Sequence, residues 1–288
     1  MSHIKALYLV DPIGYHFYPE LKTPVSSKTL KPASSIRAYL INMDRSKKRL
    51  AYVRPKIKAL GYPFERIRAT DGQSLSTQFI QKNTDTFART HWNLFSYEPN
   101  QASFLKMGDM GCVLSHIKAW KRFLKSNAQY ALIFEDDVTF NPKTLHSLLE
   151  RLKTHSTEWD IVSFDAQMLN AFYGTWTRAL LKPLPLFELK PPYRAVVYLR
   201  QVVLADAYLI NRQAAQNLVQ LALPLKQSLD HFFTRSWELH TRFIGIEPRL
   251  VHQNTYQFFS ERKHINATIR LKPLDKIVPT HNIKTHPS

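Results

Sequence analysis

The chain has 288 residues, 44% of them hydrophobic and 12% aromatic, which is enough for a sizeable core and excludes a disordered chain. Its formal net charge of +18 indicates attraction to polyanions such as nucleic acid or an anionic membrane, but says nothing about fold. A single cysteine excludes an internal disulfide, and no uncharged apolar stretch is long enough to span a membrane. We therefore expect a cytoplasmic protein, soluble or peripheral on the inner face of the cytoplasmic membrane.

The first part of the chain divides into an extension and the start of a core. Residues 1–34 contain four prolines, which oppose regular structure, and form an extension whose role the sequence does not show. A strand is predicted over residues 36–41, then a basic helix to about residue 60, then a strand over 62–67. Pro55 predicts a kink or a break in that helix, and Gly61 is placed to cap its end.

After a turn at residues 68–72, residues 73–106 have no regular pattern. Gly108 then opens an amphipathic helix that leads into a strand over 131–134. Asn141 and Pro142 predict the start of the next helix. Further strands are predicted over 159–164, 202–210 and 243–246, with a helix after Asn211 and another from Leu229, whereas residues 166–200 show no clear period. This alternation predicts an α/β fold with a mostly parallel sheet flanked by helices.

Three consecutive acids, Glu135, Asp136 and Asp137, end the apolar strand at 131–134. In open α/β sheets, ligands bind at the carboxyl edge of the strands. Adjacent carboxylates repel one another, so a divalent cation between them is favourable, and oxygen ligands favour Mg²⁺ or Mn²⁺. Such a cation could hold a diphosphate. The alternative is a solvated acidic turn with no function.

Several short motifs occur together in a fixed order. They are Ile41-Asn42-Met43-Asp44-Arg45 with Arg49, Ala69-Thr70-Asp71-Gly72, residues 108–116 from Gly108 to His116, Phe134-Glu135-Asp136-Asp137-Val138, Ala207-Tyr208-Leu209-Ile210 and Ser228-Leu229-Asp230. In this order they resemble glycosyltransferase family 25, which includes bacterial lipooligosaccharide galactosyltransferases and collagen-modifying relatives. The resemblance covers roughly residues 36–255. The sequence departs from the family pattern at residues 107–110 and at Asp206, where a small residue is common.

The resemblance implies a GT-A-like, nucleotide-sugar-binding catalytic domain over residues 35–260, followed by a basic tail over 261–288. It further implies an inverting transfer of a hexose onto a lipid-linked oligosaccharide acceptor. The commonest member of the family transfers galactose, so the implied donor is UDP-galactose. Protein acceptors and UDP-glucose are alternatives within the same family. No nucleic-acid-binding signature accompanies the positive charge, so no specific nucleic acid is expected.

The resemblance also assigns roles to residues. Glu135 and Asp137 would hold Mn²⁺ or Mg²⁺, with Asp136 beside the nucleotide sugar. Asn42, Arg49 and Asp71 would bind the base, phosphates or ribose. Inversion requires a base for the acceptor hydroxyl, and Asp230 is the candidate, with Asp165 and Asp206 as rivals.

Each of these residues also has a plain structural interpretation. Asn42 would cap a helix, Arg49 would be a solvated cation, and Asp71 with Gly72 would be an ordinary turn pair.

Ser115 and His116 do not form a nucleophile and base pair, because neighbouring helix positions do not face each other. His116 is expected to orient a loop or an acid, Cys112 to be a small buried residue, and His252 to be an ordinary histidine instead of a metal ligand.

The aromatic residues between 172 and 198 suit either sugar stacking or core packing. Three other functional classes compete with the transferase: a glycoside hydrolase built on paired carboxylates, a basic nucleic-acid-binding protein without activity, and an inactive family member.

Overall fold

The computed structural model describes residues 9–11, 14–16, 36–85, 107–168, 182–198, 202–203, 205–233 and 239–254. Eight strands in this part of the chain form one sheet. In spatial order they are β4 (Phe64–Arg68), β3 (Ile36–Asn42), β5 (Tyr130–Phe134), β12 (Ala207–Asn211), β7 (Ile161–Ser163), β13 (Phe243–Glu247), β10 (Arg194–Val197) and β9 (Leu184–Glu188). Only β12 and β10 run against the other six, so the mostly parallel sheet is confirmed.

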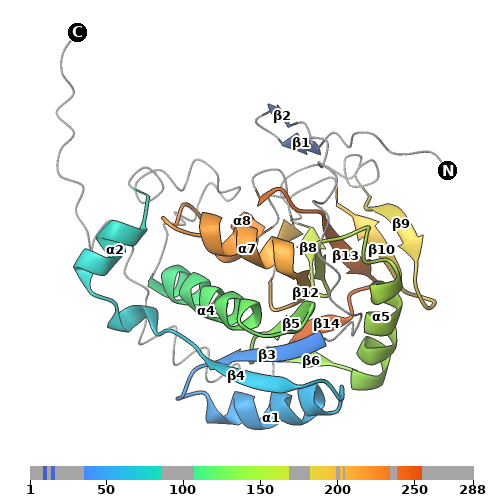
Figure 1. The fold of residues 1–288 in the computed structure, drawn as a ribbon, viewed down its shortest axis with the longest axis horizontal. Helices are drawn as coiled ribbons and strands as arrows, with labels where there is room; N and C mark the ends of the chain where they lie inside the picture. Colours follow the sequence, from blue (N-terminus) through green and yellow to red (C-terminus); the bar gives the residue numbers. More distant parts are fainter. Residues whose placement is uncertain are drawn as a thin grey trace.

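Helices cover both faces of this sheet, as Figure 1 shows. Side chains alternate along a strand. In β3, Tyr39 and Ile41 pack in a core with α4 (Met107–Leu124), α7 (Arg212–Leu221) and α8 (Leu229–Phe233). Ala38 and Leu40 pack on the other face, in a core with α1 (Lys47–Lys58) and α5 (Pro142–Thr154). The expected α/β architecture is therefore confirmed.

In the part of the chain that the structure describes, three short strand pairs lie outside the main sheet: β1 (Leu9–Asp11) with β2 (Gly14–His16), β8 (Gln167–Met168) with β11 (Val202–Val203), and β6 (Val138–Phe140) with β14 (Val251–Gln253). The last pair matters for the site, because the backbone N–H of Asn254 donates to the carbonyl of Asp137 at 2.6 Å. Among the described residues, no helix has both the length and the apolar character needed to cross a membrane.

Most predicted helix ends are confirmed. The Asn141 side chain accepts from the N–H of Thr144 at 3.1 Å, and the Asn211 side chain accepts from the N–H of Ala214 at 2.9 Å. Gly61 has a φ of 79°, the left-handed conformation expected after α1.

Pro55 was predicted to kink or split the first helix, and the split is wrong, since α1 runs unbroken through Pro55. Pro55 and Ala51 are both exposed, so water can hydrate the Ala51 carbonyl that the missing N–H leaves unpaired.

Other predictions failed where the apolar signal is weak. Residues 73–106 were expected to be irregular, yet they include most of the 3₁₀ turn η1 (Gly72–Ser74) and all of α2 (Thr77–Asn83), which buries only Ile80. The hairpin β9/β10 was also missed, because β9 contains Pro185, which is tolerated at the sheet edge where β9 lies. The single strand predicted over 202–210 is two strands, β11 and β12, and Asp206 lies between them.

Two glycines bring the first turn of α4 against the turn at residues 70–72. A Cβ on Gly72 would overlap the carbonyl of Met107, and a Cβ on Gly111 would lie 2.8 Å from the Gly72 nitrogen and 2.9 Å from the Thr70 carbonyl oxygen. Ser115 closes the same contact, since its Oγ accepts from the N–H of Thr70 at 2.8 Å and donates to the carbonyl of Gly111 at 2.6 Å. These contacts explain why this part of the chain requires small residues.

Candidate active site

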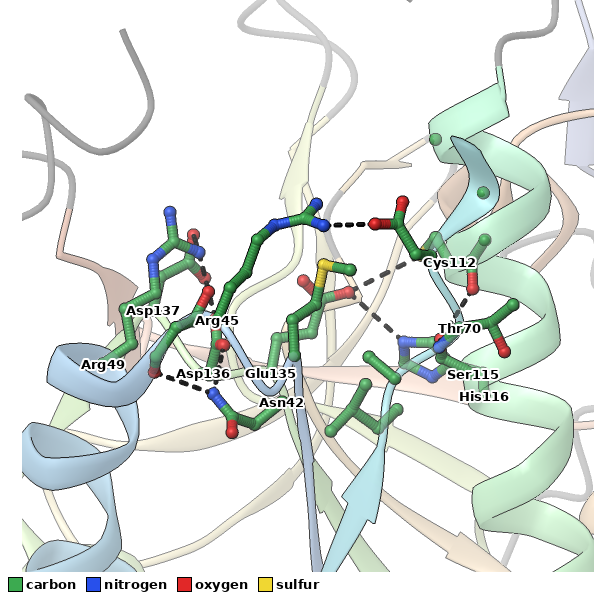
Figure 2. Close-up of a pocket in the computed structure, with 18 of the residues that line it drawn as sticks. Asn42, Arg45, Arg49, Thr70, Cys112, Ser115, His116, Glu135, Asp136 and Asp137 are labelled. Atoms are coloured by element: carbon green, nitrogen blue, oxygen red, sulfur yellow. Dashed lines mark hydrogen bonds and ion pairs between the residues drawn. The ribbon is translucent and has the colours of Figure 1, made fainter. Parts of the chain in front are cut away.

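A cavity of about 370 Å³ opens at the carboxyl ends of β3 and β5, beside the first turns of α4 (Figure 2). Four of the sequence motifs meet there, although they are far apart in the chain. The lining residues are Ile41, Asn42, Met43, Arg45, Ser46, Arg49, Ala69, Thr70, Asp71, Gly72, Gln73, Gly108, Gly111, Cys112, Ser115, His116, Glu135, Asp136 and Asp137. The acidic triplet therefore lies at the sheet edge where ligands bind in α/β proteins, as its position after a strand predicted.

Asp136 is held by two partners from the start of the domain. Arg49 Nη1 lies 3.0 Å from Asp136 Oδ1 and 3.4 Å from Asp137 Oδ2, and Asn42 Nδ2 donates to Asp136 Oδ2 at 2.7 Å (Figure 2). Burial raises the pKa of Asp136, while Arg49 and then Asn42 oppose that rise. Arg49 is therefore a largely buried ion-pair partner, with 11% of its side chain exposed, and not a solvated cation.

Asn42 is 1% exposed, and both ends of its amide have protein partners. Its Nδ2 also donates to the Ser46 carbonyl at 3.1 Å, and its Oδ1 accepts from Arg66 Nε at 2.8 Å. This geometry makes Asn42 a support for Asp136; contact between Asn42 and a nucleotide stays a prediction.

Glu135 ends a chain of hydrogen bonds that runs through the core. Trp120 Nε1 donates to the Tyr208 hydroxyl at 2.8 Å, which lies 2.7 Å from His116 Nδ1, and His116 Nε2 lies 3.2 Å from Glu135 Oε1. We assign the Nε2–H tautomer to His116, because the tyrosine hydroxyl then donates to Nδ1 and the ring donates to the carboxylate. The expectation that His116 orients an acid is confirmed, and Ser115 contacts Thr70 and Gly111 instead.

Cys112 is a second neighbour of Glu135, with its thiol sulfur 3.7 Å from Glu135 Oε1. Burial raises the pKa of the Cys112 thiol well above its usual value, and the charges of Glu135 and Asp230 raise it further. The thiol is therefore a protonated hydrogen-bond donor, not a reactive thiolate.

A second acidic cluster joins two members of the triplet to Asp206. Glu135, Asp137 and Asp206 each offer a carboxylate oxygen, and these atoms lie within 4.8 Å of one another. Asp206 is 6% exposed, and its Oδ2 has no hydrogen-bond partner among the described residues. Burial, followed by the charges of Asp165 and Glu135, raises the pKa of Asp206 well above its usual value. Three clustered carboxylates, one of which has a buried oxygen without a hydrogen-bond partner among the described residues, fit a hard divalent cation.

Asp165 is committed to the protein backbone. Its Oδ2 accepts from the N–H of Asp206 at 2.9 Å and its Oδ1 accepts from the Ser163 hydroxyl at 3.0 Å. It is 1% exposed, and burial raises its pKa to about 7. Asp165 thus fixes the backbone that carries Asp206, and substrate has no access to it.

Asp71 also lines the cavity. It pairs with Arg45, and its Oδ1 accepts from the N–H of Gln73 at 3.1 Å, which starts the turn η1. The turn interpretation of Asp71 is therefore correct, and a nucleotide contact would add to it. Arg45 was part of a sequence motif but was given no role, since one arginine in a basic chain does not indicate its partner.

The remaining candidates lie outside this cavity. Asp230 is in the first turn of α8, partly buried and close enough to raise the pKa of Cys112. His252 is exposed on β14.

The structure describes only part of the predicted aromatic segment. Phe187 stacks on His155 at 4.1 Å, Tyr193 packs against the core and Tyr198 is buried, so these rings fill the core. Phe172, Tyr173 and Trp176 lie outside the described residues.

Comparison with known proteins gives one family. The model of glycosyltransferase family 25 (LPS biosynthesis protein) matches residues 35–233. A glycosyltransferase 25 family member from Drosophila pseudoobscura pseudoobscura is 28% identical over 196 residues, covering 61% of this chain and 29% of that protein. Procollagen galactosyltransferase 2 from Homo sapiens is 23% identical over 190 residues, covering 63% of this chain and 27% of that protein. The match spans less than a third of either relative's length.

Among solved structures, residues 1–349 of S. aureus TarS align with a TM-score of 0.41 and 14% identity, covering 85% of this chain and 69% of that one. A glycosyltransferase involved in glycosylation of the major capsid of PBCV-1 aligns with a TM-score of 0.37 and 10% identity, covering 81% and 91%.

The hydroxyl of Tyr208 gives a test of the buried chain of hydrogen bonds. Tyr208→Phe leaves Trp120 Nε1 and His116 Nδ1 without their partner in the core, so we expect a loss of about 1–3 kcal/mol of unfolding free energy for each unpaired group. Urea denaturation measures this loss. Tyr198→Phe is the matched control, because the buried Tyr198 hydroxyl has no partner among the described residues, and it should cost little. Equal losses in the two variants would contradict the role given to Tyr208.

The raised pKa of Asp165 predicts a pH dependence of stability. In the metal-free protein the unfolded state ionises Asp165 near its ordinary pKa of 3.8, whereas the folded state holds its proton up to about 7. The contribution of Asp165 is therefore full below pH 3.8 and is lost as the pH rises towards 7. Unfolding free energies in EDTA between pH 4 and 8 should fall less steeply for Asp165→Asn than for the parent chain. Parallel curves would show that Asp165 does not titrate in this range.

Proposed function

The chain belongs to glycosyltransferase family 25, and we propose that it transfers a hexose from a nucleotide sugar to an acceptor hydroxyl. Its α/β fold is of the GT-A-like kind that the family resemblance implied. The observation that carries the proposal is the meeting of four polar motifs in one cavity at the carboxyl ends of β3 and β5. A glycoside hydrolase would need only a pair of carboxylates and would have no need for the Asn42, Arg49 and Asp71 part of the cavity, where we propose that the nucleotide binds.

The donor and acceptor follow from the relatives' names and not from any single side chain. One relative is called a procollagen galactosyltransferase, which supports UDP-galactose as the donor, with UDP-glucose as the alternative. The family description names LPS biosynthesis, which supports a sugar of a lipooligosaccharide or LPS core as the acceptor. A protein acceptor is the second candidate, because the human relative is named for procollagen. The charge of +18 would suit an enzyme working at an anionic membrane on the cytoplasmic side.

The metal-binding part of the site would be Glu135, Asp137 and Asp206. Their clustered carboxylate oxygens fit Mn²⁺ or Mg²⁺, and Asp206 adds a third carboxylate to the two predicted from the sequence. A bound cation would neutralise charge on the departing diphosphate. The protein's own task is to hold the carboxylates apart in fixed positions, through His116 at Glu135 and through Arg49 and Asn42 at Asp136.

The base for an inverting transfer would be Asp230. Asp165 is excluded by its two internal hydrogen bonds and its burial, and Asp206 faces the other carboxylates in the acidic cluster. Asp230 is partly exposed, and it lies close enough to the cavity-lining Cys112 for its charge to raise the pKa of that thiol, so a carboxylate there would be the base nearest to the cavity outside the acidic cluster.

Calorimetric titration with UDP, with and without Mn²⁺ and against ADP and GDP, tests the proposal directly. We expect UDP to bind and Mn²⁺ to strengthen that binding, after which a screen of UDP-sugars against lipooligosaccharide and collagen-type peptides identifies both substrates. Absence of binding by any nucleotide in either condition would overturn the proposal.

Asp137→Asn should abolish Mn²⁺-dependent UDP binding and transfer while the fold survives, because one anionic ligand is lost. Circular dichroism checks the fold and calorimetry the binding. Retention of full transfer by this variant would remove the triplet from the mechanism.

Asp230→Asn should leave UDP binding unchanged but reduce the transfer rate by about 10²–10⁴-fold, the usual contribution of a general base. Single-turnover transfer measures the rate, with calorimetry on the same preparation as the control. Normal transfer would exclude Asp230 as the base.

A further inference from the structure

We propose that Cys112, His116 and Glu135 form a site for a soft divalent cation such as Zn²⁺, distinct in ligand chemistry from the all-oxygen cluster of Glu135, Asp137 and Asp206. The proposal depends on contacts around Glu135 and holds whether or not the chain transfers a sugar.

The distances between the three ligands suit tetrahedral zinc. Cys112 Sγ lies 3.7 Å from Glu135 Oε1, and His116 Nε2 lies 3.2 Å from the same oxygen. A tetrahedral zinc ion with thiolate, imidazole and carboxylate ligands separates sulfur from oxygen by about 3.6 Å and nitrogen from oxygen by about 3.4 Å. All three donor atoms lie within 4.8 Å of one another. A cation could therefore replace the thiol proton with little movement of the side chains.

The helix and its neighbours fix the two softer ligands. Cys112 and His116 are four residues apart on α4, so they lie on one face of the helix. The His116 ring is fully buried, stacks on Tyr208 and packs against Trp120. Coordination through Nε2 would move the ring proton from Nε2 to Nδ1, which lies 2.7 Å from the Tyr208 hydroxyl oxygen and would then donate to it, the usual arrangement of a zinc-binding histidine.

The surroundings also favour a cation. Cys112, His116 and Glu135 all line the 370 Å³ cavity, so a fourth coordination position would face its interior, as in zinc sites with three protein ligands. The carboxylates near Cys112, those of Glu135, Asp230, Asp109 and Asp206, create a negative potential. Binding would release one proton from the thiol, because a coordinating thiol is deprotonated.

Because Glu135 is shared, the two metal clusters would compete for it. Glu135 belongs to both clusters, so Zn²⁺ bound with Cys112 and His116 would draw Glu135 away from Mn²⁺ or Mg²⁺. Zinc would then act as an inhibitor of the proposed enzyme. This one step relies on the proposed function, whereas the zinc site itself does not.

Cobalt titration tests the site without an activity measurement. Cys112 is the chain's single cysteine, so a thiolate-to-cobalt charge-transfer band on adding Co²⁺ to the metal-stripped chain has one possible source. We expect such a band at one Co²⁺ per chain and its loss when Zn²⁺ is added. Absence of a band in the parent chain would overturn the proposal.

Two variants separate the two clusters. Cys112→Ser should fold, because the serine hydroxyl keeps a hydrogen-bond donor for Glu135. We expect this variant to lose the charge-transfer band and to bind Zn²⁺ at least about tenfold more weakly. Its Mn²⁺ binding, measured by electron paramagnetic resonance, should persist. Asp137→Asn should keep the band and Zn²⁺ binding and lose Mn²⁺ binding. Loss of the band in Asp137→Asn would refute a separate soft-metal site. Failure of the parent chain to bind Mn²⁺ would count against the proposed function and leave the zinc site standing.

Discussion

The described structure depends on supplying hydrogen bonds and one arginine to three adjacent acids at the end of a buried strand. The acids contact different parts of the chain. Glu135 accepts from His116 and Cys112, Asp136 pairs with Arg49 and Asn42, and the Asp137 carboxylate shares Arg49 while its backbone carbonyl accepts from the N–H of Asn254. Because unpaired buried charge is costly, these contacts require β3, α4, α1 and the end of β14 to meet at one place. The cavity is a result of that requirement.

The sequence was sufficient for the parts whose signal is local. The helix at 107–124 and the strand at 130–134 have strong apolar periods, and Asn141 and Asn211 cap helices through contacts three residues away. The position of the acidic triplet at the sheet edge also followed from the sequence, since a strand's carboxyl end fixes where the next residues lie.

The parts that the sequence did not predict depend on contacts between distant residues. The bond between Tyr208 and His116 joins residues 92 apart, and nothing in either neighbourhood indicates it. Asp206 looked like a departure from a family pattern, yet the break between β11 and β12 places its carboxylate against Glu135 and Asp137. Short elements such as α2 were missed because one buried side chain gives no period.

The glycine contact between the turn at residues 70–72 and α4 has a consequence for protein engineering. Since a Cβ at Gly72 or at Gly111 would overlap backbone atoms of the facing segment, this wall of the cavity tolerates no added side chain at either position. Mutant libraries aimed at a new donor sugar would therefore gain little from randomising that wall. Diversity belongs on side chains that face the cavity without supporting it, such as Met43 and Gln73.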